Sequence, residues 1–193
     1  MEEVRTLSIS ECEGAAQCLA EAFAVDEVAR YFVDTPDMEN VTEAAKWKLH
    51  LSIMRYMTAA HCYKGIVTTG RVRFFKEFFP LLHDTKHNVM GERDGNSYYL
   101  VYLGSKASAR GKGYARKLIE HMTVKADSEN RATYLESSAH GNLSYYEKYG
   151  FVHKSDIQLE RGPKPIKLHI MVREPVNEAE GSKGGERVGG RML

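Results

Sequence analysis

Apolar residues recur every three or four positions along three stretches of the chain, and this spacing predicts three amphipathic helices. The stretches are 10–23, 42–57 and 115–126. Each would turn one apolar face toward a core and a polar face toward water. Ser10 and Glu13, three positions apart, have the pattern of a capping box and would start the first helix.

Short apolar or β-branched runs between these stretches predict strands. They cover residues 4–9, 65–70, 99–103, 133–138, 151–160 and 167–173. The last two would form a hairpin around Gly162. Residues 72–79 suggest one more helix, disturbed at Pro80, and residues 84–96 suggest a polar link. Helices that alternate with strands favour an α/β sandwich with a mixed sheet.

Residues 104–119, which lead from a predicted strand into a predicted helix, have an unusual charge pattern. They contain no acidic side chain and five basic ones, namely Lys106, Arg110, Lys112, Arg116 and Lys117. The N-terminal end of a helix carries partial positive charge and normally attracts acids, so cations gathered there indicate an anion between them. Small residues with free N–H groups, a helix dipole and added Arg and Lys together predict a phosphate-binding loop.

Two common phosphate-binding loops do not fit this segment. A P-loop has four residues between its first glycine and its Gly-Lys pair, whereas six residues separate Gly104 from Gly111. Gly113 also follows Lys112 where a P-loop has Ser or Thr. A dinucleotide fingerprint needs a third glycine, and Arg116 stands in its place.

The loop and a second motif resemble those of one enzyme family. Arg110, Gly113 and Ala115 match the Gln/Arg-x-x-Gly-x-Gly/Ala loop of the GCN5-related N-acetyltransferases (GNAT), which holds a pyrophosphate. The run Tyr146–Phe151 matches their Tyr-Glu-Lys-x-Gly-Phe signature. The resemblance covers residues 96–173, and within it the chain is especially similar to puromycin N-acetyltransferase and its fungal and bacterial relatives.

The resemblance implies a three-layer α/β/α sandwich with acetyl-CoA as cosubstrate. Its mixed central sheet would splay between the strand that ends at Leu103 and the strand that ends near Glu136, with the coenzyme in the gap. The residues implied to bind the coenzyme are Leu103, Gly104, Ser105, Arg110, Gly111, Lys112, Gly113, Tyr114, Ala115 and Asn142. An alternative for Lys112 is a solvated side chain, and an alternative for Asn142 is a helix cap.

Acetyl transfer to an amine needs a neutral amine and a proton for the departing thiolate. Tyr146 is predicted to be the general acid from its place in the motif, because a hydroxyl with a pKa near 10 can protonate a thiolate whose thiol has a pKa of about 8.5. Glu136 is the candidate general base, and a purely structural hydrogen bond is its alternative. His140 is a weaker candidate base, and Tyr145 is expected to pack.

One feature departs from the family pattern. Relatives have a turn and another strand after the strand that matches residues 65–70, whereas here only Gly70 separates Thr69 from Arg71. The sheet is therefore predicted to lack one strand of its N-terminal half. Either the strands at 65–70 and 99–103 pair directly, or the sheet carries an open edge.

Composition narrows the class of protein. A net charge of +1 argues against general nucleic-acid binding, and no secretory segment or membrane span is visible. Cys12, Cys18 and Cys62 form no paired framework and fit a reducing compartment, so a cytoplasmic location is expected. The histidines and cysteines show no zinc-binding motif, so no metal is predicted.

The sequence thus predicts an acetyl-CoA-dependent N-acetyltransferase. Residues 1–175 would be one domain with a coenzyme-binding core at 96–173, and residues 176–193 a disordered, Gly-rich tail. The acceptor is expected to be a small-molecule amine that attacks directly in a ternary complex; alternatives are a protein or peptide amine, or an inactive CoA-binding homologue. Two alternatives stay open for five aromatic residues, which would either line an acceptor pocket or fill the core. They are Trp47, Phe74, Phe75, Phe78 and Phe79.

Overall fold

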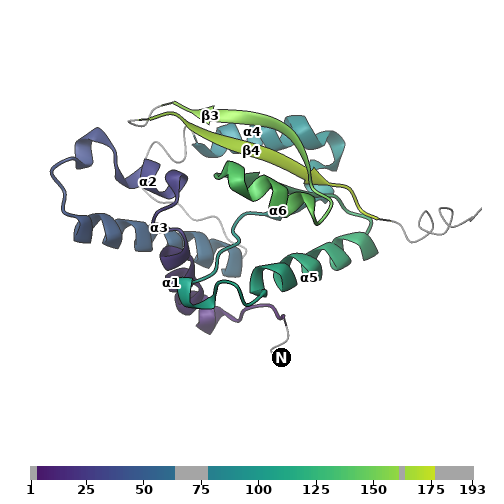
Figure 1. The fold of residues 1–193 in the computed structure, drawn as a ribbon, viewed down its shortest axis with the longest axis horizontal. Coiled ribbons are helices and arrows are strands. Elements are labelled where there is room, and N and C mark those ends of the chain that lie inside the picture. Colours follow the sequence, from purple (N-terminus) through teal and green to yellow (C-terminus); the bar gives the residue numbers. More distant parts are fainter. Residues whose placement is uncertain (1–3, 64–77, 161–163, 177–193) are drawn as a thin grey trace, which may run out of the picture.

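The computed structural model describes residues 4–63, 78–160 and 164–176, and its elements are arranged as in Figure 1. The helices are α1 (Cys12–Ala22), α2 (Glu27–Val33), α3 (Glu43–Tyr63), α4 (Phe79–Met90), α5 (Tyr114–Ser128) and α6 (Leu143–Glu147). The strands are β1 (Tyr98–Leu100), β2 (Thr133–Ser137), β3 (Val152–Leu159) and β4 (Ile166–Arg173). Short 3-10 turns are η1 (Ile9–Glu11), η2 (Pro36–Met38), η4 (Gly91–Asn96), η5 (Ala107–Ala109) and η6 (His140–Asn142).

The strands form one mixed sheet in the order β1-β2-β4-β3. β1 runs parallel to β2 over three residue pairs, the last being Leu100 and Leu135. β2 and β3 both run antiparallel to β4. Within the described residues β1 is an edge strand. The predicted mixed sheet is confirmed, whereas the predicted strand at 65–70 lies outside the described residues, so its pairing with 99–103 is not tested.

Helices cover both faces of this sheet, because successive side chains of a strand point to opposite faces. On one face Tyr134 and Ile170 pack with Met90 of α4. On the other face Leu135 and Met171 pack with side chains of α5 and α6. Figure 1 shows α4 and α6 on opposite sides of the β3–β4 hairpin. The expected three layers of helix, sheet and helix are therefore present.

The N-terminal segment differs from its predicted form. Residues 4–8 form no strand, and Ile9 opens the 3-10 turn η1. Ile9 is 54% exposed, so the weak alternation there does not mark a buried strand face. The capping interaction before α1 also lies two positions earlier than predicted, since the Glu11 carboxylate accepts the N–H of Ser8 at 2.9 Å.

Helix α4 replaces most of the predicted polar link at 84–96. Pro80 stands in its first turn, where proline starts a helix rather than disturbing it. The polar composition of residues 84–96 led to the prediction of a link. In the structure the helix forms because Val89 and Met90 pack on the sheet while its exposed positions are polar. Asp94 in η4 then binds the ammonium of Lys86 and holds the end of the segment against the helix.

Helix α2 was not predicted from the sequence. The Asp26 carboxylate starts this helix by accepting the N–H groups of Val28 and Ala29 at 3.0 and 3.1 Å.

The cysteines differ from their predicted state. Cys12 is disulfide-bonded and Cys18 is free, so the expectation that no cysteine is paired is wrong for Cys12. Among the described residues, no helix combines the length and apolarity needed to cross a membrane.

Candidate active site

A cavity of about 690 Å³ opens where β1 and β2 stop pairing. The two strands are hydrogen-bonded only as far as Leu100 and Leu135. Beyond this point β2 continues along β4, whereas residues 101–106 belong to no strand. This space, the gap cavity, therefore lies between β2 and the segment that follows β1. The expected splay of the sheet is confirmed, although β1 ends at Leu100 and not at the predicted Leu103.

Unpaired backbone N–H groups border the gap cavity at two places. Within the described residues no backbone hydrogen bond uses the N–H groups of 101–105, and all of these residues except Tyr102 line the cavity. Where α5 begins, the first N–H that bonds back along the helix is that of Lys117, at 3.1 Å from the carbonyl oxygen of Gly113. The N–H groups of 114–116 remain available, as at any helix start.

Three glycines give the loop between these two places its path. Gly111 and Gly113 have φ angles of +75° and +77°, a left-handed conformation that costs other residues ~1–2 kcal/mol. A Cβ on Gly104 would lie 2.8 Å from the Cβ of Ala22 and 2.9 Å from the ring of Phe23. The loop can therefore turn into α5 and pass close to α1 only because these positions are glycine.

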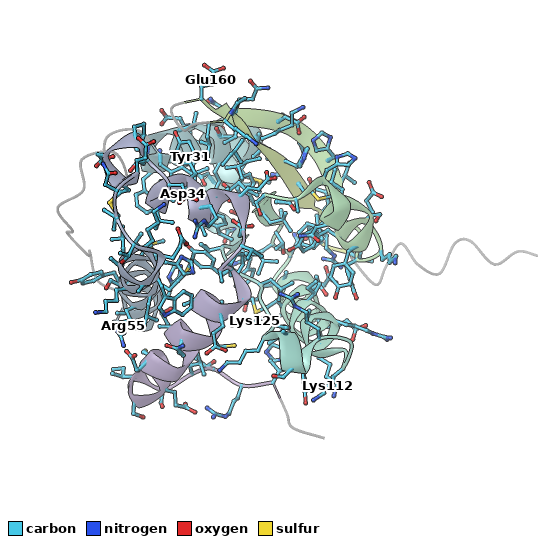
Figure 2. The ribbon with its side chains drawn as sticks, turned by 60° about the vertical axis from the view of Figure 1, so that its left-hand side comes forward. Tyr31, Asp34, Arg55, Lys112, Lys125 and Glu160 are labelled. Carbon is cyan, nitrogen blue, oxygen red and sulfur yellow. The ribbon has the colours of Figure 1, made fainter. Side chains whose placement is uncertain are left out.

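The basic side chains of the loop differ in whether they form an ion pair with an acidic residue. Lys106 and Arg116 form ion pairs with acidic residues of α1 and α5, at 3.2 and 2.7 Å. Arg110 lines the gap cavity, and no ion pair between described residues engages it. Lys112 does not line the cavity and lies at the outer edge of the molecule (Figure 2). The solvated alternative for Lys112 therefore fits its position better.

Helix α6 supplies a protonated hydroxyl to the gap cavity. Tyr146 lines the cavity and packs edge-on against Phe151, with ring centroids 5.8 Å apart. Burial raises the pKa of the Tyr146 hydroxyl, so it keeps its proton at neutral pH. Tyr145, expected only to pack, also lines the cavity. The side chain of Asn142 makes no capping hydrogen bond, and it too lines the cavity.

Glu136 lies on β2 just past the last residue pair with β1. Its Oε2 accepts a hydrogen bond from the hydroxyl of Tyr99 at 2.6 Å. Its Oε1 is buried and has no hydrogen-bond partner among the described residues. Burial raises the pKa of Glu136, although the nearby hydroxyls of Tyr99 and Tyr134 oppose this effect. One oxygen of Glu136 is therefore bound by Tyr99, and the other makes no hydrogen bond to a described residue.

A second cavity, of about 560 Å³, lies on the α4 side of the sheet. We call it the apolar cavity, because one wall consists of apolar residues from α2, α3 and the start of α4, which are Val28, Phe32, Ile53, Met54, Met57, Phe78, Phe79 and Leu82. Its lining also includes Lys86, Asp94 and three histidines. It shares five lining residues with the gap cavity, which are Phe23, Asp26, Val101, Glu136 and Ser138. The two cavities therefore meet at two carboxylates.

These two carboxylates are not equivalent. One oxygen of Asp26 caps α2, and the other accepts a hydrogen bond from the hydroxyl of Ser138. Both oxygens of Asp26 are thus engaged, whereas Glu136 has a free one. Of the two, Glu136 is the better placed to take up a proton.

The structure gathers most of the predicted site. All of the predicted coenzyme-binding and catalytic residues except Lys112 line the gap cavity. His140 does not; its ring lies edge-on against His169, with centroids 5.2 Å apart. Trp47 lines neither of the two cavities. The other predicted pocket residues are Phe78 and Phe79, which line the apolar cavity, and Phe74 and Phe75, which lie outside the described residues.

Sequence reasoning missed three polar residues of the junction, namely Asp26, Tyr99 and Ser138. A signal existed for two of them. Asp26 precedes Glu27 and Val28 as a helix cap would. Tyr99 pairs with Tyr134 on the parallel strand β2. Glu136 lies two positions beyond Tyr134, so the side chains of Tyr99 and Glu136 point to the same face of the sheet.

Comparison with known proteins agrees with the geometry. Residues 82–153 match the family model described as Acetyltransferase (GNAT) domain. An uncharacterized N-acetyltransferase of Schizosaccharomyces pombe is 33% identical over 89% of this chain and 83% of its own length.

Two solved structures show the same fold. One is a histone acetyltransferase HPA2 and related acetyltransferase from Corynebacterium glutamicum, with a TM-score of 0.55, 18% identity, and coverage of 89% of this chain and 95% of that one. The other is arylalkylamine N-acetyltransferase 2 from Aedes aegypti, with a TM-score of 0.53, 17% identity, and coverage of 88% and 97%. At these identities the likeness concerns the fold alone.

Proposed function

This chain belongs to the GNAT superfamily of N-acetyltransferases, and from that premise we propose that it transfers an acetyl group from acetyl-CoA to the amine of a small, largely apolar molecule. The observation that carries the proposal is the meeting of two unlike cavities at Glu136. One cavity is bordered by unpaired N–H donors and Arg110, and the other is apolar.

The gap cavity suits a long thioester with a pyrophosphate. The unpaired N–H groups of 101–105 would bind the pantetheine arm as an added strand would, and those at the start of α5 would bind the pyrophosphate together with Arg110. Acetyl-CoA would supply an activated acetyl group. The carbonyl needs a donor where negative charge develops, and a free N–H of 101–105 is suitable.

Proton transfer is divided between two side chains. An alkylammonium has a pKa near 10 and must lose a proton before its nitrogen can attack. The free oxygen of Glu136 would take this proton, and its raised pKa makes it a stronger base than an exposed glutamate. The Tyr146 hydroxyl, protonated at neutral pH, would give a proton to the departing thiolate. The new amide loses its second N–H proton to water or to the tyrosinate.

The apolar cavity suggests the kind of acceptor. Its volume of about 560 Å³ would hold a single ring system with a short alkylamine chain. The cation would lie at the junction, near the negative charges of Asp26 and Glu136. An arylalkylamine matches this distribution of charge better than a polyamine, whose further cations would enter an apolar space at high cost.

Thiol release from acetyl-CoA tests the proposal. The purified protein is given acetyl-CoA with arylalkylamines, with polyamines or with Lys-containing peptides, and free thiol is followed. We expect turnover with arylalkylamines and much lower kcat/KM with the other two classes. Turnover only with peptides would support a protein acetyltransferase instead. Binding of CoA without turnover on any amine would support an inactive homologue.

Three lesser expectations stay predictions. They are the single domain of residues 1–175, the disorder of the tail, whose residues 177–193 lie outside the described residues, and the cytoplasmic location. The disulfide at Cys12 weighs against a reducing compartment, where such bonds are uncommon. Counting free thiols in protein taken from cells under acid quench would decide whether this bond forms in vivo.

A further inference from the structure

The β3–β4 hairpin carries a cluster of side chains that the acetyl-transfer site does not use. Asp156 Oδ1 lies 2.7 Å from His153 Nε2 and 2.7 Å from His169 Nδ1. One atom from each residue, a nitrogen or a carboxylate oxygen, lies within 4.8 Å of the others. None of the three lines the gap cavity or the apolar cavity.

An irregularity in β3 brings these residues onto one face of the sheet. His153 and Asp156 are three positions apart, so an unbroken strand would point them to opposite faces. The register shifts between His153 and Ser155, which leaves Lys154 as an extra residue. His153 then pairs with Met171 and Asp156 pairs with His169, two positions apart on β4. Such bulges commonly redirect a side chain at a functional site.

The donor set and its spacing suit a transition metal. Two imidazole nitrogens and one carboxylate oxygen are ligands of Zn²⁺ and similar ions. In a tetrahedral zinc site, with bonds of about 2.0–2.1 Å, neighbouring ligand atoms lie about 3.3 Å apart. The two separations of 2.7 Å from Asp156 Oδ1 would have to widen by about half an ångström. The two imidazole nitrogens, which lie within 4.8 Å of each other, would have to reach the same spacing.

The surroundings hold a competitor for the metal ion. The ammonium of Lys167 lies 3.3 Å from the second oxygen of Asp156, so it would compete with the ion for this carboxylate. His140 packs edge-on against the ring of His169, with centroids 5.2 Å apart, but it is not among the residues whose ligand atoms lie within 4.8 Å of one another.

We propose that His153, Asp156 and His169 form a binding site for a divalent transition metal ion, with Zn²⁺ as the best fit, and that water completes the coordination. The sequence predicted no metal because these residues are spaced along a β-hairpin rather than in a helical or Cys-containing zinc motif. The site would join β3 to β4 beside η6, the turn that leads into the helix bearing Tyr146. The proposal does not depend on the acetyl-transfer activity.

Equilibrium binding tests the proposal directly. Untagged full-length protein is stripped with a chelator and titrated with ZnCl₂ in competition with a chromophoric chelator. We expect one ion per chain and a Kd below about 1 μM, as for protein sites with several nitrogen and oxygen ligands. Co²⁺ should give the visible absorption bands of four-coordinate cobalt. Saturating Zn²⁺ should also raise the melting temperature, because it binds only the folded chain.

Variants separate a built site from loose surface binding. His169→Gln and Asp156→Asn should each weaken Zn²⁺ binding at least about tenfold and abolish the gain in melting temperature. His153→Gln gives the same result with less risk to folding, since its side chain is 39% exposed. The matched control is His121→Gln, an exposed histidine on α5, which should bind Zn²⁺ as the wild type does.

Lys167→Ala provides a test of opposite sign. Removal of the competing ammonium should tighten Zn²⁺ binding by about two- to fivefold, in keeping with the strength of an exposed ion pair. Binding of much less than one ion per chain, or equal binding by wild type and His153→Gln, would mean an adventitious ion only. Either result would overturn the proposal.

Discussion

The gap cavity and the apolar cavity meet at the carboxylates of Asp26 and Glu136, yet the chain encodes the two cavities differently. Most of the gap cavity comes from two segments that lie close in the sequence, residues 100–116 and 136–149. The apolar cavity draws its lining from α2, α3, α4 and η4, from β1, β2 and β4, and from residues just after α1, β1 and β2. The first cavity is polar on one side and shaped by glycines, whereas the second is mainly apolar.

This difference explains why the gap cavity could be predicted from the sequence better than the apolar cavity. A phosphate-binding loop needs particular residues at fixed spacing, because positive φ angles and free N–H groups occur at definite positions. An apolar pocket needs only side chains of suitable size, and these have the same pattern as a core. The comparison also suggests that binding of the coenzyme and choice of acceptor can be altered separately, except at Glu136.

Glu136→Gln should have the largest effect, because the residue borders both cavities. We expect kcat/KM to fall by about 10²–10⁴-fold, the usual contribution of a general base, while CoA affinity stays the same. Since burial raises the pKa of Glu136, wild-type kcat/KM should fall as pH drops through a value above the usual range for glutamate. This acid limb should be missing in the variant.

Glu129→Gln is the matched control for Glu136→Gln. Glu129 accepts a hydrogen bond from the Tyr98 hydroxyl at 2.8 Å, much as Glu136 does from Tyr99, but it lines neither cavity. Its kcat/KM and pH profile should match those of the wild type. Equal losses in both variants would point to a structural role for Glu136.

Tyr146→Phe should have the next largest effect, a fall in kcat of about 10²-fold at neutral pH. The loss should shrink above pH ~8.5, where the free thiolate is stable without a proton. Tyr56→Phe, at a 53% exposed position on α3, is the control. Full activity of Tyr146→Phe at every pH would exclude it as the general acid.

Gly113→Asp should weaken CoA binding by about tenfold or more without changing the choice of acceptor. The left-handed φ of +77° strains any side chain by ~1–2 kcal/mol, and the added negative charge would repel the pyrophosphate. Calorimetric titration with CoA measures the change. Gly95→Asp, where an added Cβ meets nothing within 4 Å, controls for the charge, and equal affinities of the two variants would contradict the loop assignment.

Ile53→Ala should have the smallest effect and act only on the apolar cavity. The KM for an arylalkylamine should rise several-fold, because about three buried CH₂ or CH₃ groups are lost at up to ~0.8 kcal/mol each, while the KM for acetyl-CoA stays constant. Ile9→Ala, at a 54% exposed position, is the control. An unchanged amine KM would show that the acceptor binds elsewhere.

The sequence predicted the elements that carry strong local patterns. The β3–β4 hairpin, α5 and the left-handed Gly150, with φ of +84°, follow from periodicity and cap chemistry. Residues 84–90 and α2 were missed because their helices depend on packing against the sheet and on the Asp26 cap more than on their own apolar pattern. Apolar and polar residues alternate over 4–9, but no strand lies beside this segment among the described residues. Alternation alone therefore gave a wrong prediction of a strand.

The candidate site shows the same division. Arg110 and Tyr146 belong to contiguous motifs, so the sequence could propose them as site residues, and both line the gap cavity. The Tyr99–Glu136 hydrogen bond, at 2.6 Å, depends on the parallel register of β1 and β2, which no single segment encodes. The His153–Asp156–His169 cluster depends on the bulge at Lys154, and no residue pattern in the sequence predicts this bulge.

A bisubstrate compound tests the central claim, that the two cavities join at Glu136, most directly. In this compound the sulfur of CoA is linked through an acetyl bridge to the nitrogen of an arylalkylamine, and its affinity is measured by calorimetry against CoA alone. If the cavities are continuous, the compound should bind at least about 100-fold more tightly, because the second group binds at high effective concentration. An affinity no greater than that of CoA would contradict the account.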